Sequence, residues 1–235
     1  MTEPSDRNLF RRKHHNNILS VLRSLNGDFL REVECHFGGG TAVVLGLDEY
    51  RESVDIDFLC ASQQGYRKLR QAIWGTTDLS GLLRPLAKLD TLREVRSDQY
   101  GIRTIIGVEG ISIKFEIIRE ARISLAGEMD DRFGVPVLTR DCMYAENLLA
   151  NADRWMDKAV LNRDILDLSM MISRWGPIPD HAWAISESAY GDTIRKSYER
   201  AIGRLRNAEW LRQCMDAMAM EPDLEKEILA LWGGL

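Results

Sequence analysis

Two aspartates interrupt an otherwise apolar stretch at residues 54–60, VDIDFLC. Alternation along a strand puts Asp55 and Asp57 on one face and their apolar neighbours on the other. Their Cα atoms would lie ~7 Å apart, so both carboxylates can reach one point above the sheet. Two like charges this close repel each other unless a cation lies between them. Mg²⁺, which prefers a few carboxylates with waters and phosphate oxygens, would resolve that repulsion. The alternative is an exposed strand face with solvated aspartates.

A second strand is predicted at residues 111–118, ISIKFEII, where isoleucine and phenylalanine alternate with Ser112, Lys114 and Glu116. If this strand lies antiparallel beside residues 54–60, it presents Glu116 to the same cation. A third carboxylate is what a two-metal site would need, with its ions ~3.5–4 Å apart around a transferred phosphorus. The alternative is a Lys114–Glu116 pair that faces water.

Three consecutive glycines, residues 38–40, follow a predicted strand and precede a predicted helix. The first turn of such a helix leaves backbone N–H groups unpaired at its positive end, where phosphate oxygens bind well. Neither the dinucleotide-binding pattern GxGxxG nor the P-loop pattern GxxxxGK[ST] occurs here. The glycines therefore suggest a phosphate cradle of another kind, or a simple tight turn.

Several secondary-structure elements are needed to hold these residues in place. Apolar spacing predicts helices at 9–25, 41–47 and 66–74, strands at 33–37 and 54–60, and a hairpin of 102–108 and 111–118 that turns at Glu109-Gly110. Residues 135–138 are predicted to form a short edge strand, because proline is confined to sheet edges or strand starts. Residues 76–100 show no clear pattern.

The composition changes near residue 139, beyond which glycine is sparse and alanine, leucine, methionine and arginine dominate. Leu161, Ile165, Leu168 and Ile172 recur at helical spacing. We therefore predict an α+β protein with a mixed α/β region at 1–139 and an all-helical region at 140–235. Tryptophans such as Trp155 are expected to anchor the core rather than to stack on nucleic-acid bases.

The bulk composition, with a formal charge of −5 over 235 residues, is that of a globular protein and gives no global attraction to nucleic acid. A local basic run, RRKHH at 11–15, could bind nucleic acid or form a solvated helix face. The four cysteines lack CxxC spacing, which favours reduced thiols and a cytoplasmic location. No apolar stretch is long enough to span a membrane, and the polar start MTEPSDRNLF is not a signal peptide.

Taken together, the glycines with Thr41, the pattern R-x-S-x-D-x-D at residues 51–57, IKFEI, and AENLLANADRW followed by NRDILDL form a joint signature. This signature resembles the nucleotidyltransferases of the AbiEii/AbiGii toxin family, which belong to the DNA polymerase β-like superfamily. The likeness extends over about residues 36–170. It implies a polymerase β-like nucleotidyltransferase core, with a small mixed sheet and helices, followed by the all-helical region.

The resemblance also implies roles for individual residues. Asp55 and Asp57 would hold Mg²⁺ or Mn²⁺, and Glu116 would ligate metal or activate the acceptor hydroxyl. Asp164 matches a further catalytic aspartate of the family, with Asp167 beside it; the alternative is an Arg163–Asp167 surface pair with a solvated neighbour. Nucleotide contacts would come from the remaining matched positions: Gly39, Gly40, Thr41, Ser53, Lys114 and Asn147.

Asn147 departs from the family pattern, which has lysine at this position of AENLLA. A lysine ammonium could neutralise phosphate charge, whereas an amide can only donate hydrogen bonds. Arg154 lies ~10 Å further along the predicted helix. Either another basic residue, such as Lys114 or Arg103, supplies the positive charge of the missing lysine, or the transfer activity is impaired.

The activity implied by the resemblance is transfer of a nucleotide from a nucleoside triphosphate to an acceptor hydroxyl, with release of pyrophosphate. RNA, such as a tRNA 3′ end, is the first expectation for the acceptor, and a cognate antitoxin is an expected partner. Basic residues that could line the RNA path are Arg84, Lys88, Arg93, Arg96 and Arg103. The alternatives are a catalytically silent nucleotide- or partner-binding module and a metal-dependent nuclease or phosphatase.

Overall fold

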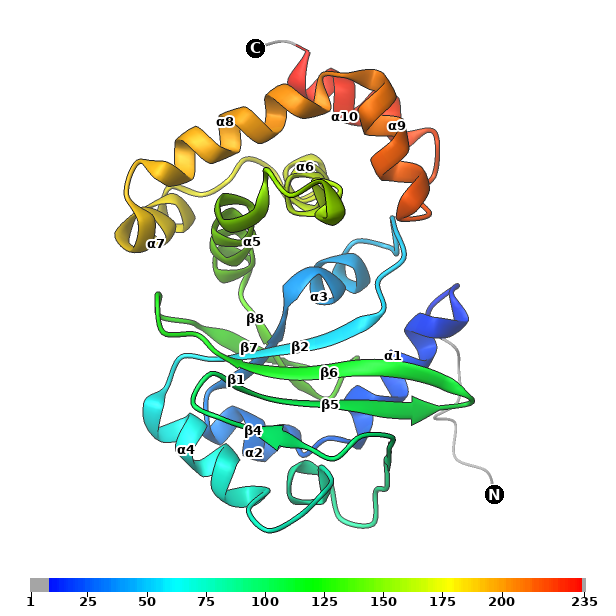
Figure 1. Cartoon of the computed structure of the whole chain (residues 1–235), viewed down its shortest axis with the longest axis vertical. Helices are drawn as coiled ribbons and strands as arrows, with labels where there is room; N and C mark the ends of the chain where they lie inside the picture. Colours follow the sequence, from blue (N-terminus) through cyan, green and yellow to red (C-terminus); the bar gives the residue numbers. More distant parts are fainter. Residues whose placement is uncertain (1–8, 234–235) are drawn as a thin grey trace.

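A computed structural model describes residues 9–233 (Figure 1). The prediction that the polar start MTEPSDRNLF is not a signal peptide concerns residues that lie mostly outside this range. Eight strands form one mixed sheet in the order β3-β5-β6-β2-β1-β8-β7, with β4 paired to β5. The strands are β1 (Cys35–Gly38), β2 (Asp55–Cys60), β3 (Asp90–Thr91), β4 (Arg96–Ser97), β5 (Gly101–Val108), β6 (Ile111–Arg119), β7 (Gly127–Asp130) and β8 (Val135–Leu138).

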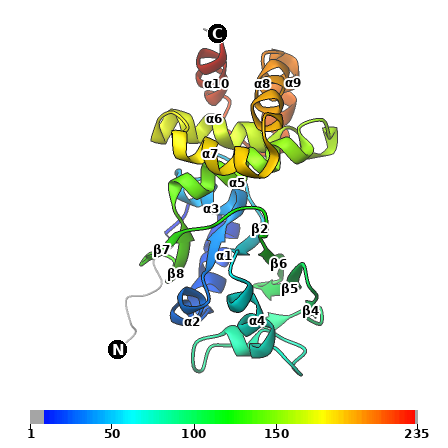
Figure 2. The same cartoon turned by 90° about the vertical axis from the view of Figure 1, so that its left-hand side faces the viewer.

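Helices cover both faces of this sheet (Figure 1). On one side lie α1 (Lys13–Ser24), α2 (Gly27–Glu32) and α4 (Gln63–Ala72), and α3 (Gly39–Gly46) packs on the other. Beyond α3 the remaining helices stack as a separate layer, shown at the top of Figure 2: α5 (Arg140–Arg154), α6 (Arg163–Trp175), α7 (Asp180–Tyr190), α8 (Thr193–Leu205), α9 (Ala208–Ala217) and α10 (Leu224–Trp232). Two short 3₁₀ turns, Ser80–Leu82 and Lys158–Val160, complete the elements.

A row of aromatic side chains fills the core beneath the central strands. The rings of Phe37 and Phe58, on the neighbouring strands β1 and β2, have their centroids 5.6 Å apart, and those of Phe58 and Phe115 are 5.9 Å apart. All three side chains are buried, as is Ile56. Because side chains alternate along a strand, this packing forces the aspartates of β2 onto the opposite face, toward α3 and α5.

The hairpin of β5 and β6 is confirmed, with Glu109 and Gly110 both at positive φ in its turn. The expected direction of β6 relative to β2 is wrong, because the two strands run parallel, with Asp57 opposite Glu116. Residues 61–100, which include α4 and two short strands, form the long crossover that parallel neighbours require. Glu116 nevertheless lies beside Asp57, as predicted from the two strands.

The predicted helix at 9–25 begins later than expected, at Lys13. The backbone N–H groups of Arg11 and Arg12 donate instead to the two carboxylate oxygens of Glu49, at 2.6 and 3.0 Å. The backbone of the first two residues of the RRKHH run is therefore held by Glu49, directly before α1 begins. The other predicted helix and strand boundaries before residue 75 shift by one to three residues.

The short strand at 135–138 is present as β8 but is not an edge strand, because it lies between β1 and β7. Its parallel contact with β1 consists of the single pair Phe37–Val137, so the missing N–H of Pro136 removes little from that ladder. This edge of the sheet is formed by β7. Its four residues, GEMD, alternate too weakly between apolar and polar side chains to be predicted as a strand.

Beyond Thr139 the described residues form helices and turns, in agreement with the predicted all-helical region. The Thr139 hydroxyl caps α5 by accepting from the N–H of Cys142. Trp155, Trp175 and Trp183 pack against the core as expected, but Trp74 is 83% exposed and anchors nothing. The four cysteines are buried free thiols, as predicted. Across residues 9–233 we find no helix with the length and apolar character needed to cross a membrane.

Candidate active site

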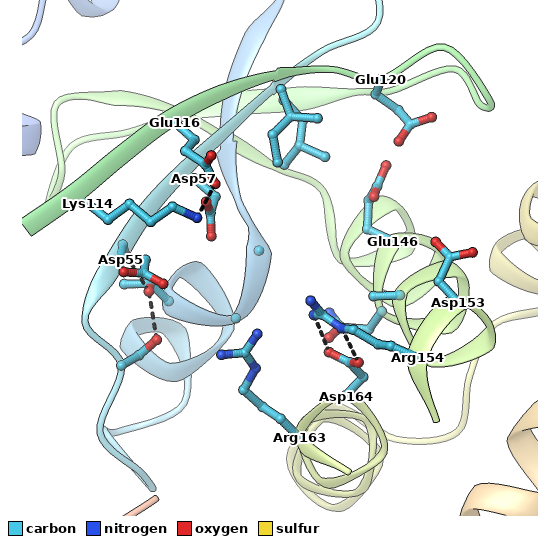
Figure 3. A pocket seen from close by; sticks show the side chains of 18 of the residues that line it. Asp55, Asp57, Lys114, Glu116, Glu120, Glu146, Asp153, Arg154, Arg163 and Asp164 are labelled. Atoms are coloured by element: carbon cyan, nitrogen blue, oxygen red, sulfur yellow. Dashed lines mark hydrogen bonds and ion pairs between the residues drawn. The ribbon is translucent and has the colours of Figure 1, made fainter. Parts of the chain in front are cut away.

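A cavity of about 360 Å³ opens between the sheet and the helical layer. Its walls come from β2, β6, the N-terminus of α3, α5 and the first turn of α6 (Figure 3). All ten residues to which the sequence assigned a role line this one cavity, although they are up to 125 positions apart: Gly39, Gly40, Thr41, Ser53, Asp55, Asp57, Lys114, Glu116, Asn147 and Asp164. Their individual roles remain predictions.

The two aspartates of β2 share the cavity wall with Glu116. In the parallel ladder, Asp57 is the register partner of Glu116 and Asp55 is the partner of Lys114. Register partners on adjacent strands point to the same face, so all three carboxylates face the cavity, as Figure 3 shows. Burial and then the neighbouring charges of Asp55 and Glu116 raise the pKa of Asp57 to about 6.

This donor set fits a hard divalent cation. Carboxylate oxygens are the protein ligands that Mg²⁺ prefers, and a bound cation would offset the burial and the like charges that raise the pKa of Asp57. Within residues 9–233, however, no three acidic, histidine or cysteine side chains have already converged into a metal cluster. Asp55 and Asp57 are therefore the fitting ligands, and Glu116 needs to move before it can join them.

Glu116 is held by two cations in this conformation. Arg103 Nε donates to one of its carboxylate oxygens at 3.0 Å, and Lys114 Nζ contacts the other at 2.5 Å. Burial acts to lower the pKa of Lys114, but its hydrogen bond with Glu116 raises it overall, so the ammonium stays charged. The expected Lys114–Glu116 pair thus exists, but inside the cavity rather than in open water.

The glycine turn closes on Asp57 from the side of α3. Gly39 has φ +66°, and a Cβ atom added there would lie 3.0 Å from Asp57 Oδ2. A Cβ at Gly40 would lie 2.5 Å from Arg51 Nη2. No side chain caps the start of α3, so the N–H groups of its first turn face the cavity beside the two carboxylates. The glycine turn predicted from the sequence therefore lies at the cavity, and its role in phosphate binding stays a prediction.

Thr41 and Ser53 have hydroxyls that already bond to protein groups. The Thr41 hydroxyl donates to the backbone carbonyl of Asp55 at 2.6 Å, so its oxygen accepts from the Ser53 hydroxyl at 2.7 Å. These bonds tie the first turn of α3 to the start of β2. In this conformation, both side chains therefore position the cradle and Asp55, and neither hydroxyl proton is left for a phosphate.

A buried relay of polar groups, which sequence reasoning missed, fixes the backbone of Ser53. The N–H of Ser53 donates to His15 Nε2 at 3.2 Å, so the ring proton resides on Nδ1 and is donated to Glu49 at 2.7 Å. Burial lowers the pKa of His15, which keeps the ring neutral. His15 lies 34 positions from Glu49 and 38 from Ser53, so no local motif in the sequence could have indicated the relay.

The alternative in which Arg163 pairs with Asp167 at the surface is excluded. Asp167 is buried, accepts two hydrogen bonds of 2.7 Å from Arg51, and also accepts from the Tyr50 hydroxyl at 2.5 Å. Asp164, the predicted catalytic aspartate, lies on the cavity wall in a two-bond fork with Arg154, with both distances 2.7 Å. In this conformation the Asp164 carboxylate orients Arg154 rather than a metal ion.

Asn147, where the sequence departs from the pattern it resembles, lines the cavity together with Arg163. The side-chain amide of Asn147 donates to the carbonyl of Met143 in its own helix, at 2.9 Å. Arg163, at the start of α6, lines the cavity with its guanidinium near the two aspartates (Figure 3). Arg163 makes no hydrogen bond or ion pair within the described part of the chain, and its charge acts to lower the pKa of Asp57. The cavity therefore contains an unengaged cation, for which the sequence had suggested only the alternative of a surface pair.

The far end of the cavity holds a second group of charged residues. Glu120, Arg122, Glu146 and Asp153 line it, with Glu120 and Glu146 drawn opposite each other in Figure 3. None of these four was predicted to have a role. Two of them, Glu146 and Asp153, belong to the motif AENLLANADRW that the sequence singled out.

Comparison with known families gives a match over most of the chain. Residues 21–230 match the model of the family described as "Nucleotidyl transferase AbiEii toxin, Type IV TA system". The match spans both the sheet and the helical layer, and it includes every residue that lines the cavity. No curated protein sequence matches the chain.

Solved structures with a similar arrangement include an antigenic nucleotidyltransferase-like protein from Paracoccidioides brasiliensis and JHP933 from Helicobacter pylori. The first has 14% sequence identity and a TM-score of 0.46, with 94% of each chain covered. The second also has 14% identity, with a TM-score of 0.39, and the alignment covers 86% of this chain and 99% of the other.

Proposed function

Because the chain belongs to the AbiEii nucleotidyltransferase toxin family, we propose that it transfers a nucleoside monophosphate from a nucleoside triphosphate to a hydroxyl of RNA. The observation that carries this proposal is the cavity in which Asp55 and Asp57 face the glycine turn of α3. Carboxylates for a cation and N–H groups for phosphate oxygens lie side by side in one cavity. This is the arrangement that phosphoryl transfer needs.

In the proposed reaction, an oxygen of the acceptor attacks the α-phosphorus while the bond to the β-phosphate oxygen breaks and pyrophosphate leaves. Asp55 and Asp57 would hold Mg²⁺, which supplies charge neutralisation at the attacking and leaving oxygens. The N–H groups at the start of α3 bind the phosphates of the donor. Glu116 lies beside Asp57. Once the Glu116 carboxylate is released from Lys114 and Arg103, it accepts the proton of the acceptor hydroxyl.

Arg163 supports activity despite the asparagine at position 147. A guanidinium is always charged and can donate two parallel hydrogen bonds to a phosphate group. Arg154, the other arginine nearby, is engaged by Asp164, which leaves Arg163 as the available partner. We assign to Arg163 the neutralisation of triphosphate charge that the lysine performs in the family pattern.

An RNA acceptor is supported by a second hollow on the opposite side of β6. Arg119 faces this hollow, whereas its neighbours Ile118 and Glu120 line the cavity, so one strand borders both spaces. The hollow, about 790 Å³, also contains Arg67, Arg70 and the exposed ring of Trp74, with glutamines and no acidic residue among its lining. Arginine and exposed aromatic rings are the groups that bind single-stranded nucleic acid.

This surface differs from the RNA path expected from the sequence. Arg84 donates to the carbonyls of Leu25 and Gly134 and so has a structural role, and Arg103 is paired with Glu116 and Asp98. A reducing, cytoplasmic setting suits both an RNA acceptor and four buried free thiols. The family's description as part of a toxin–antitoxin system supports an antitoxin partner.

The test is incubation of the protein with Mg²⁺, each nucleoside triphosphate labelled at the α-phosphate, and total RNA. Label that appears on RNA, and is lost with Asp57→Asn, supports the proposal. Shortened RNA without label would instead identify a metal-dependent nuclease. Retained triphosphate binding without either product would identify a silent binding module, which the engaged amide of Asn147 favours as the second candidate.

A further inference from the structure

The register of the sheet places a row of functional positions across neighbouring strands. Gly38 of β1 pairs with Asp57 of β2, and Asp57 pairs with Glu116 of β6. Glu116 in turn pairs with Arg103 of β5, which pairs with Arg96 of β4. Register partners point to the same face, so the two arginines extend the cavity face beyond Glu116. With strands ~4.8 Å apart, Arg103 lies ~10 Å from Asp57 across the sheet.

This row gives the acceptor a direction of approach. In phosphoryl transfer the attacking and leaving oxygens lie roughly in line, on opposite sides of the phosphorus. In the proposed function the glycine turn, which begins at Gly38, binds the donor's phosphates, so pyrophosphate leaves on the β1 side of Asp57. The acceptor hydroxyl therefore approaches from the other side, over Glu116 and the strand that carries Arg103.

Arg103 lies between two acidic groups at the boundary of the cavity. Its Nε donates to Glu116 at 3.0 Å, and its Nη1 donates more weakly to Asp98, at 3.4 Å. Gly101 leaves room for this guanidinium, because a Cβ atom there would lie 3.2 Å from Arg103 Nη2. The Arg103 side chain is 41% exposed and that of Glu116 is 14% exposed. Of the two partners, the arginine is therefore the one that a large acceptor can reach first.

Arg96 carries a cation without a protein partner beside Arg103. It lies on the exposed strand β4, and its side chain makes no hydrogen bond or ion pair within residues 9–233. Like charges directly opposite each other on neighbouring strands are destabilising. The repulsion increases in the proposed reaction, because Glu116 leaves Arg103 and takes its counter-charge away. One phosphodiester group supplies the single negative charge that replaces it.

Resting on the proposed function, we propose that Arg96 and Arg103 together bind a backbone phosphate of the acceptor RNA, namely the phosphate nearest to its attacking terminal hydroxyl. Arginine forms bidentate contacts with phosphate, and these replace the single bond from Arg103 to Glu116. The phosphate draws the Arg103 guanidinium toward Arg96. Glu116 thereby loses one of its two cation partners when the acceptor is in place, which favours its movement toward the cation at Asp57.

The turn between β4 and β5 connects this phosphate site with the hollow on the other side of the sheet. The N–H of Asp98 donates to the carbonyl of Gly101 at 3.0 Å and closes the turn, and Gln99 within it lines the hollow. The hydroxyl of Tyr66, also in that lining, donates to the carbonyl of Asp98 at 2.7 Å. An RNA strand with its last phosphate at Arg103 can therefore continue around this turn to the arginines of the hollow.

The experiment measures the affinity for a short fluorescent single-stranded RNA by anisotropy, with Mg²⁺ and a non-cleavable triphosphate present. A second RNA has an uncharged methylphosphonate in place of the linkage next to its 3′ end. The wild-type protein should bind this modified RNA about tenfold more weakly, which is the effect of one charged hydrogen-bonded contact. The slope of log affinity against log salt concentration should also fall by ~0.7.

The double variant Arg96→Ala/Arg103→Ala should lose the contact from the protein side. It should bind the unmodified RNA about tenfold more weakly than the wild-type protein does, and it should not distinguish the two RNAs. Arg103→Lys keeps the charge and should retain part of the discrimination. Arg31→Ala on α2, which removes an exposed arginine paired with Asp28, is the matched control and should behave as wild type.

Thermal melting of each variant checks that it folds. A wild-type protein that binds both RNAs equally, or a double variant that discriminates between them as strongly as the wild-type protein, would overturn the phosphate site. Either result leaves label transfer to total RNA, and with it the proposed function, intact. Absence of label transfer to total RNA by the wild-type protein would instead remove the proposed function and this inference with it.

Discussion

Arg51 and Asp167 form a buried two-bond ion pair that joins the segment before β2 to α6. The side chains are only 2% and 1% exposed, and both hydrogen bonds are 2.7 Å long. Arg51 also lies under Gly40, so the pair supports the glycine turn from below. The sheet and the helical layer are therefore held together directly beneath the candidate active site.

Removal of one partner should destabilise the fold strongly. Asp167→Ala leaves the Arg51 guanidinium buried without a counter-charge, which should cost about 3–5 kcal/mol in the free energy of unfolding. Urea denaturation measures this loss. Glu227→Gln, which breaks the partly exposed pair of Glu227 with Arg174, is the control and should cost less than about 1 kcal/mol. A loss for Asp167→Ala as small as that of the control would show that the pair does not hold the layers together.

Gly39 should tolerate no side chain without loss of activity. Gly39→Ala puts a Cβ atom 3.0 Å from Asp57 Oδ2 and forces alanine to adopt φ +66°. We expect a stability loss of about 1 kcal/mol from the backbone strain, together with a larger fall in nucleotide transfer because Asp57 is displaced. Gly203→Ala on α8 is the control: its Cβ would meet no atom within 4 Å, and the stability should rise by about 0.5–1 kcal/mol. Equal activity in the two variants would contradict the assigned role of the glycine turn.

Arg163 and Asn147 should behave as alternative positions for one positive charge. Arg163→Ala should lower transfer about 10²-fold, in line with the loss of one group that stabilises transition-state charge. Asn147→Lys in the Arg163→Ala background should restore much of that loss, since it returns the lysine of the family pattern. The measurement is the initial rate of label transfer at saturating triphosphate. Lys196→Ala, a surface change on α8, serves as the control.

Two results would contradict this exchange of roles. An Arg163→Ala variant with the full wild-type rate would show that its cation is not used. Failure of Asn147→Lys to rescue a slow Arg163→Ala variant that is folded would show that the two positions are not equivalent. In that case Lys114 would be the remaining cation beside the aspartates.

His15 should make stability depend on pH. Burial lowers the pKa of the folded-state ring below its ordinary value of 6.5, so below that value the unfolded chain binds more protons than the folded one. The stabilisation is therefore fully present above pH 6.5 and is lost as the pH falls through the folded-state pKa. Urea denaturation at pH 7.5 and 5.5 should show this fall in the wild-type protein.

The matched comparison for the histidine prediction is His15→Gln against His181→Gln. His15→Gln should reduce the difference in stability between pH 7.5 and 5.5, because the buried titrating ring is gone. His181 is exposed on α7, so its replacement should leave the pH dependence as it is. His36, also buried with a lowered pKa, accounts for a fall that persists in His15→Gln. An undiminished fall in that variant would contradict the relay to Ser53.

Local patterns in the sequence predicted the parts of the fold and site that depend on neighbouring residues. Strand alternation placed Asp55 and Asp57 on one face because Ile56 and Phe58 must enter the core. The turn at Glu109-Gly110 follows from Gly110, because glycine adopts positive φ readily. Composition also located the change to helices near Thr139, where a threonine caps α5.

Relationships across long sequence separations were not predictable in this way. The direction of β6 depends on the crossover of residues 61–100, in which short strands leave little periodic signal. The partner of Asp167 is Arg51, 116 positions away, which excludes the alternative of a local i to i+4 pair with Arg163. Because Asp167 binds elsewhere, Arg163 is free to face the cavity, a consequence that only the tertiary structure reveals.

The most direct test of a cation at Asp55 and Asp57 is a crystal soaked with Mn²⁺ and a non-cleavable triphosphate, measured for anomalous scattering. The predicted result is a manganese peak within direct ligand distance of both carboxylates, with phosphate oxygens against the N–H groups of Gly39 and Gly40. A bound triphosphate whose manganese contacts neither aspartate, or phosphates placed away from the glycine turn, would contradict the account.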